Sequence, residues 1–232
     1  MKRLHLWALA LGLTTAVASA QAGKTVDVAR LKVGLSDDSW QVSEEMPFRR
    51  EVSSAQGSFA GASKVMTLRD ADGKALALLY VAATWGKPQV YNRYSACPAN
   101  SRVYARDLNV NKNENIRCLY FGGPYDTASL LKGALPSLQD AATTMALAHT
   151  DTAFYMNLFL TAHGGVHIYV EGLFAPGFVG IANGTPVGEA PPSLKPGTAA
   201  WADAFAASAL EALTSFSGAL PVPALAFEAA PK

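Results

Sequence analysis

The sequence predicts an α+β fold: a mainly antiparallel sheet with two hairpins, one mid-chain helix and one C-terminal helix packed on the sheet. Three observations support this prediction. Strand-like stretches flank short turns at 64–84 and 154–174, and apolar residues recur at helical spacing over 126–148 and again over 198–217. The order of strands, helix, hairpin and helix is typical of a sheet that carries helices on it.

The N-terminal part of the chain is expected to form strands at 31–35 and 40–42. Pro47 is expected to interrupt this strand region. The small residues of 57–61 predict a flexible loop.

The first hairpin is predicted from strands at 64–70 and 75–84. Asp72 and Gly73 lie between them and form a favoured two-residue turn, because both positions tolerate positive φ. The return strand is almost continuously apolar, which is typical of a central strand.

The middle of the chain predicts a loop, a strand and a helix. Residues 85–113 contain glycine, proline and several asparagines, which favour loops, and a strand is expected at 116–121. The helix over 126–148 would have Asp126 or Thr127 as its N-cap. Pro136 would kink that helix or begin a second one.

The second hairpin joins two strands at 154–162 and 166–174. A two-residue loop would mix polar and apolar side chains on each face, whereas a three-residue loop separates them. We therefore predict the three-residue loop, with Gly165 in the left-handed conformation. The apolar set is Leu158, Leu160, Ala162, Val166, Ile168 and Val170; the polar set is His167, Tyr169 and Glu171.

The last helix is expected to be capped by Gly197 or Thr198 and to end near Ser217. Its predicted apolar stripe comprises Trp201, Phe205, Ala209, Ala212, Leu213 and Phe216. The expected organisation is a signal peptide at 1–20, a single α+β domain at 21–218 and a Pro/Ala-rich tail at 219–232. That tail would form either an extended edge segment or a disordered end.

Composition excludes several classes of protein. The 232 residues carry 19 basic and 18 acidic side chains, half are hydrophobic and two are cysteines. A disordered chain would be less apolar, a disulfide-dense scaffold would hold more cysteines, and a nucleic-acid binder would be more basic. A soluble globular domain with no nucleic-acid partner is expected.

The first twenty residues have the pattern of an export signal. Lys2 and Arg3 precede an apolar run over 4–17, and Ala18-Ser19-Ala20 fits the small-x-small cleavage rule. The run is shorter than the roughly 20 residues that a membrane-spanning helix needs. We therefore expect a periplasmic or secreted protein, with no transmembrane segment after cleavage.

Export makes the two cysteines informative. Cys97 and Cys118 are separated by 21 residues, and an oxidising compartment favours a bond between them. Redox motifs place their cysteines closer together, and a zinc site would need two further ligands. A structural disulfide is expected.

Catalytic and metal-binding signals are weak. Ser129-x-x-Lys132 matches one motif of serine acyl enzymes, but its companion motifs are missing. His163-x-x-x-His167-x-x-x-Glu171 has the spacing of metal ligands, yet glycines and strand-like alternation replace the helix that such ligands need. We predict no metal, no cofactor and, on balance, no enzyme.

A basic aromatic segment, residues 85–117, is the remaining site prediction. Aromatic faces stack on sugars, and arginine forks pair with carboxylates or phosphates. The alternative is an ordinary solvated loop whose aromatic residues cover the sheet edge. The predicted binding residues are Trp85, Tyr91, Arg93, Tyr94, Arg102 and Arg106.

Together these signals favour an exported, non-catalytic binding or interaction protein of the bacterial periplasm. It would contact an envelope or secreted protein, or an anionic glycan, through the basic aromatic segment. The alternative is a periplasmic hydrolase with a histidine-containing site on the second hairpin. Its predicted groups are His149, His163, His167 and Glu171.

Overall fold

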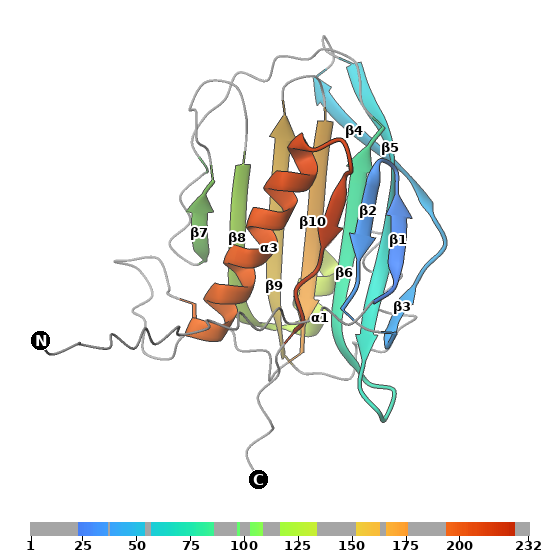
Figure 1. Cartoon of the computed structure of the whole chain (residues 1–232). Coiled ribbons are helices and arrows are strands. Elements are labelled where there is room, and N and C mark those ends of the chain that lie inside the picture. Colours follow the sequence, from blue (N-terminus) through green and yellow to red (C-terminus); the bar gives the residue numbers. More distant parts are fainter. Residues whose placement is uncertain are drawn as a thin grey trace, which may run out of the picture.

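The computed structural model shows a mostly antiparallel β-structure with two helices among the residues that it describes, which is an α+β architecture (Figure 1). No helix in the described part of the chain is both long and apolar enough to cross a membrane. The described residues are 23–36, 38–53, 57–85, 97, 103–108, 117–133, 152–162, 166–175 and 194–225.

A large sheet forms the frame of the molecule. Its strands follow the order β3-β5-β6-β10-β9-β8-β7, with β4 also paired to β5, and every neighbouring pair is antiparallel. The strand bounds are β3 Trp40–Val42, β4 Met46–Ser53, β5 Gly57–Arg69, β6 Ala75–Thr84, β7 Tyr104–Asp107, β8 Arg117–Asp126, β9 Thr152–Ala162 and β10 Val166–Phe174.

A small sheet brings the two ends of the described chain together. Strands β1 (Thr25–Val28) and β2 (Leu31–Gly34) are antiparallel, and β11 (Ala219–Pro221) runs parallel to β2. Between β1 and β2, the Arg30 guanidinium donates hydrogen bonds to the carbonyl oxygens of Ala212 and Ser215. The start of the domain is thus fixed to the end of the last helix.

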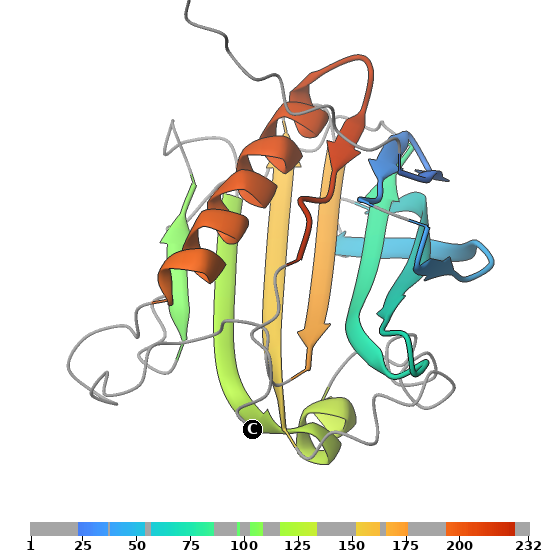
Figure 2. The same ribbon diagram turned by 60° about the horizontal axis from the view of Figure 1, so that its bottom comes forward.

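One face of the large sheet, which we call the helix-covered face, lies under α3 (Pro196–Thr214) and the small sheet (Figures 1 and 2). Aromatic rings fill the space beneath α3: Phe174 lies against Phe121 and Trp201, and Trp201 stacks on Phe205. The Trp201 indole also donates a hydrogen bond to the carbonyl oxygen of Pro223, 3.0 Å away. This interface is the main hydrophobic core.

The opposite side, which we call the second face, carries a smaller core around Val65, Leu78, Tyr80 and Leu173. Helix α1 (Thr127–Gly133) packs there through Leu130.

Two expectations for the N-terminal region are wrong. Pro47 does not interrupt the strands but lies within β4, and residues 57–61 do not form a loop but begin β5. Pro47 is paired with Ala62 on one side of β4 only, so its missing N–H leaves the ladder intact. Gly61 is a residue of β5, and glycine is needed there because a Cβ would lie 1.9 Å from the Ala83 carbonyl oxygen.

The first hairpin has a three-residue loop, Ala71–Gly73, instead of the expected two-residue turn. The Asp70 and Lys74 backbones close the loop, and Gly73 adopts a positive φ of 81°. The Asp70 carboxylate accepts hydrogen bonds from the N–H groups of Asp72 and Lys74. A glycine in this last position is typical of three-residue hairpins.

Strand β7 lies inside the loop-rich segment 85–113. It pairs with β8 on the side opposite to β9 and forms the edge of the large sheet. Strand β8 extends to Asp126, five residues beyond the predicted end. The Asp126 carboxylate then accepts a hydrogen bond from the Ser129 N–H at 2.7 Å, as an N-cap does. Hydrogen bonds from the Ser129 side chain and from this N–H lower the pKa of Asp126. The helix expected over 126–148 is described only as far as Gly133.

The second hairpin pairs Ala162 with Val166, the register that a three-residue loop requires. Residues 163–165, including the predicted left-handed Gly165, lie outside the described part of the chain.

Helix α3 begins at Pro196, and its N-cap residue is Lys195 instead of Gly197 or Thr198, because proline suits the first helical turn. It ends at Thr214, so Phe216 leaves the predicted stripe and is fully exposed. The other five members of that stripe are buried. The first residues of the expected tail form β11.

Candidate functional site

A polar cluster lies on the second face, where β9 and β10 run side by side. Strand alternation sends Leu158 and Val170 into the main core and leaves the intervening side chains on the opposite side. Those intervening residues include Tyr155, Asn157, Tyr169 and Glu171, which we call the tyrosine–glutamate cluster.

Hydrogen bonds in the cluster converge on one carboxylate oxygen. The hydroxyls of Tyr155 and Tyr169 both donate to Glu171 Oε1, at 2.6 and 2.7 Å. The Asn157 amide in turn donates to the Tyr169 hydroxyl at 2.9 Å and to the Tyr155 hydroxyl at 3.3 Å. The two hydroxyl protons thus point toward Glu171, an arrangement that suits a carboxylate, which only accepts.

The second oxygen of this carboxylate is in a different situation. Glu171 is 4% exposed, and its Oε2 atom has no hydrogen-bond partner among the residues that the structure describes. A buried charge without a counter-ion is costly, so such an atom calls for an explanation.

The two tyrosines remain proton donors over a wide pH range. Burial raises the pKa of Tyr155 and of Tyr169 above its ordinary value, and the hydrogen bond to Glu171 and its negative charge raise each further. The cluster therefore combines stable hydroxyl donors with one acceptor.

Aromatic rings lie beside the cluster. Tyr80 on β6 is the register partner of Glu171, and its ring meets that of Tyr169 edge to face at 6.2 Å between centroids. Phe159 lies on the other side of Tyr169, 6.3 Å away. The charged group thus sits in an aromatic environment that presents its hydroxyls inward.

His167 belongs to the same face but not to the same network. It is buried, its backbone N–H donates to the Thr84 hydroxyl, and its ring lies 6.1 Å from that of Phe159. It lies four positions before Glu171 along one strand, so their Cα atoms are roughly 13 Å apart. The two predicted hydrolase groups are not brought into direct contact.

The other predicted histidines, His149 and His163, lie outside the described residues. Within the described ranges, no three His, Cys, Asp or Glu side chains are grouped closely enough to hold a metal ion.

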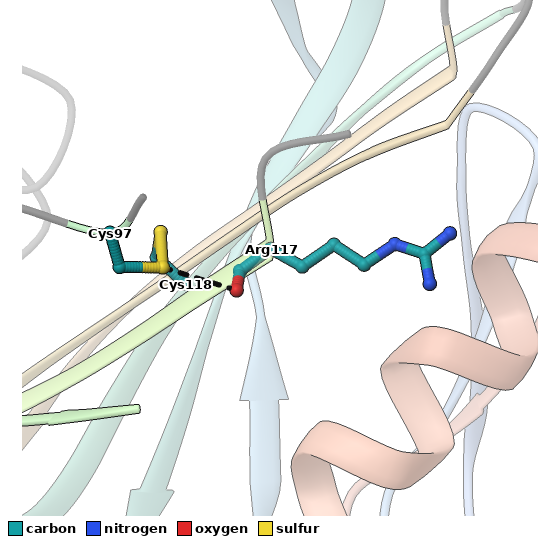
Figure 3. Close-up of a disulfide and its surroundings, with 3 residues drawn as sticks. All are labelled: Cys97, Arg117 and Cys118. Atoms are coloured by element: carbon teal, nitrogen blue, oxygen red, sulfur yellow. Dashed lines mark hydrogen bonds between the residues drawn. A yellow bond between two sulfur atoms is a disulfide. The ribbon is translucent and has the colours of Figure 1, made fainter. Parts of the chain in front are cut away.

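The predicted disulfide is present. Cys97 is bonded to Cys118, and their Cα atoms are 5.6 Å apart. Cys118 is the register partner of Phe159, so the bond lies on the second face, next to the tyrosine–glutamate cluster. Figure 3 shows the Arg117 side chain extending to the other side, toward the helix ribbon, while its carbonyl oxygen lies 3.3 Å from the Cys97 sulfur.

Two of the six predicted binding residues fall in the described part of the chain. Trp85, just after β6, is 57% exposed. Arg106, on β7, forms an ion pair with Asp203 of α3, which gives it a structural role in joining two elements. The remaining four, Tyr91, Arg93, Tyr94 and Arg102, lie outside the described residues.

Sequence reasoning placed Tyr169 and Glu171 on one polar face but missed their partners on β9. The signal was available, because Tyr155 and Asn157 alternate with the apolar Met156 and Leu158. The three-residue loop also places Asn157 opposite Glu171.

Comparisons with known proteins supply no relative: no family model matches the chain, and no curated protein or solved structure is significantly similar to it.

Proposed function

We propose that this chain is an exported, non-catalytic binding protein of the bacterial periplasm. It contacts an envelope protein or an anionic glycan through the basic aromatic segment, residues 85–117. The observation that supports this proposal most directly is the Cys97–Cys118 bond, which anchors the segment to β8. A bond that restrains a segment lowers the entropy that the segment loses when it binds.

The chemistry of the segment favours an anionic partner. Arginine forks pair with carboxylate, phosphate or sulfate groups, and exposed aromatic rings such as Trp85 add stacking area. Arg106 forms an ion pair with Asp203, so we do not rely on it for this role. Arg93 and Arg102 are the arginines that we assign to the partner.

The test compares two pairs of substitutions. Arg93→Ala/Arg102→Ala removes two charges from the segment, and Lys24→Ala/Lys32→Ala removes two exposed charges from the region of the small sheet. Each protein is tagged, crosslinked in its native cells and purified. It is also passed over immobilised heparin, a sulfated glycan.

The arginine variant should lose its protein partner or its retention on heparin, by about tenfold or more. The lysine variant should behave like the unchanged protein. Equal recovery and equal retention of all three proteins would refute the assignment. Hydrolysis of an envelope fragment that disappears in His167→Ala would instead favour the hydrolase.

A further inference from the structure

The tyrosine–glutamate cluster has an unbalanced charge. Glu171 is buried, both neighbouring hydroxyls donate to its Oε1, and Oε2 has no partner among the described residues. Among the described residues, Asn157 and the tyrosines that contact the cluster carry no positive charge. The site is therefore complementary to a cation that donates a hydrogen bond to Oε2.

The surroundings select the kind of cation. Calcium and magnesium require about six or more oxygen ligands, and no suitable group of carboxylates exists in the described part of the chain. Aromatic rings, in contrast, attract organic ammonium and guanidinium groups through their faces. Tyr155 and Tyr169 adjoin the carboxylate through their hydroxyls, and Tyr80, the register partner of Glu171, contacts the Tyr169 ring.

The neighbouring groups also hold the carboxylate ready. Asn157 orients the hydroxyls of Tyr155 and Tyr169, and these hydroxyls fix Oε1. A carboxylate held in this way loses little freedom when a ligand arrives at Oε2. Tyr155 and Tyr169, which hold this carboxylate, are themselves only partly buried.

We propose that the tyrosine–glutamate cluster is a binding site for an alkylammonium or guanidinium group, which pairs with Glu171 Oε2 between tyrosine rings. This site is distinct from the basic aromatic segment, because it is selective for the opposite charge. The group can belong to a free amine or to a lysine or arginine side chain of a protein partner.

The test is an NMR titration of the exported protein labelled with ¹³C in its tyrosine rings. The probes are n-butylammonium, ethylguanidinium, a blocked Gly-Lys-Gly peptide and the uncharged n-butanol. We expect saturable shifts of the Tyr155 and Tyr169 signals with a charged probe, but not with n-butanol. Tyr104 on β7, away from the cluster, is the internal control.

Two variants locate the charge. Glu171→Gln should weaken binding about tenfold or more, because a charged hydrogen bond is lost. Glu211→Gln, at an exposed position of α3, should leave the affinity unchanged. If Glu171→Gln fails to fold, the titration of the unchanged protein with the charged probes and n-butanol is sufficient to test the proposed binding site.

The outcomes separate the sources of the cation. Binding of free amines but not of the peptide identifies a small-molecule ligand, and binding of the peptide as well identifies a side chain of a partner. The proposal is refuted if no charged probe shifts the two tyrosines, if n-butanol acts equally well, or if Glu171→Gln binds unchanged. None of these results depends on Arg93 or Arg102, so the proposed function is tested separately.

Discussion

Removal of the Cys97–Cys118 bond should lower the stability of the domain substantially. The bond closes a loop with a sequence separation of 21 residues. In the chain-entropy model, release of such a loop in the unfolded state costs about 3 kcal/mol of unfolding free energy. For a domain of this size, the same loss corresponds to a fall in Tm of roughly 6–12 °C.

The assay is urea unfolding of the double variant Cys97→Ser/Cys118→Ala, followed by tryptophan fluorescence. Serine suits the partly exposed position 97, and alanine suits the buried position 118. The unchanged protein measured with a reductant is the matched control, because it loses the bond but keeps both side chains. The two should agree to within about 1 kcal/mol.

A loss well below about 1 kcal/mol in both samples would refute the reasoning. It would mean that the segment is restrained in the unfolded chain without the bond, or that the bond strains the folded state. A loss in the double variant alone would assign the effect to the buried Cys118 side chain rather than to loop closure.

Two further predictions concern the edges of the sheet. In a double-mutant cycle of Arg106→Ala and Asp203→Ala measured by urea unfolding, the coupling free energy between the two side chains should be about 0.2–1 kcal/mol. It should be this small because both side chains are nearly half exposed. A coupling free energy of zero would contradict the structural role given to Arg106. At alkaline pH, the unfolding free energy should fall from about pH 10 upward, because unfolded tyrosines ionise there while Tyr155 and Tyr169 keep their protons in the folded state. This loss should be smaller in Tyr155→Phe/Tyr169→Phe, and an identical pH profile in that variant would contradict it.

The second hairpin was predictable because its side chains alternate over a long stretch. The apolar set of β9 and β10 can face one core only if the loop has three residues, and the observed register meets that condition. The N-cap at Asp126 and the buried stripe of α3 were predictable for the same reason, since each depends on local spacing.

The missed strands depend on contacts that are distant in the sequence. Pro47 is tolerated in β4 because β4 pairs on one side only, and Gly61 is needed because Ala83 of β6 approaches closely. Neither fact is visible in the local sequence. The short β7 shows no clean alternation of buried and exposed residues, so its pairing with β8 could not be predicted from period alone.

The candidate site also combines a part that local alternation predicts with a part that depends on distant contacts. The polar face of β10 followed from alternation, whereas the convergence of two hydroxyls on one oxygen depends on the register between β9 and β10 and on side-chain rotamers. Arg106 shows the converse case. Its charge suggested a ligand, but α3 brings Asp203 beside it.

The pairing of β2 with β11 has a consequence for the order in which the molecule can be assembled. The partner of Val33 is Leu220, so almost the whole described chain lies between two strands that touch. Contacts of such long range form late, because the intervening loop must first be organised. The large sheet can begin to form from its hairpins before the C-terminal part of the chain has been synthesised. The small sheet has to wait for residues 219–221, so it is completed by the last of its strands to be made.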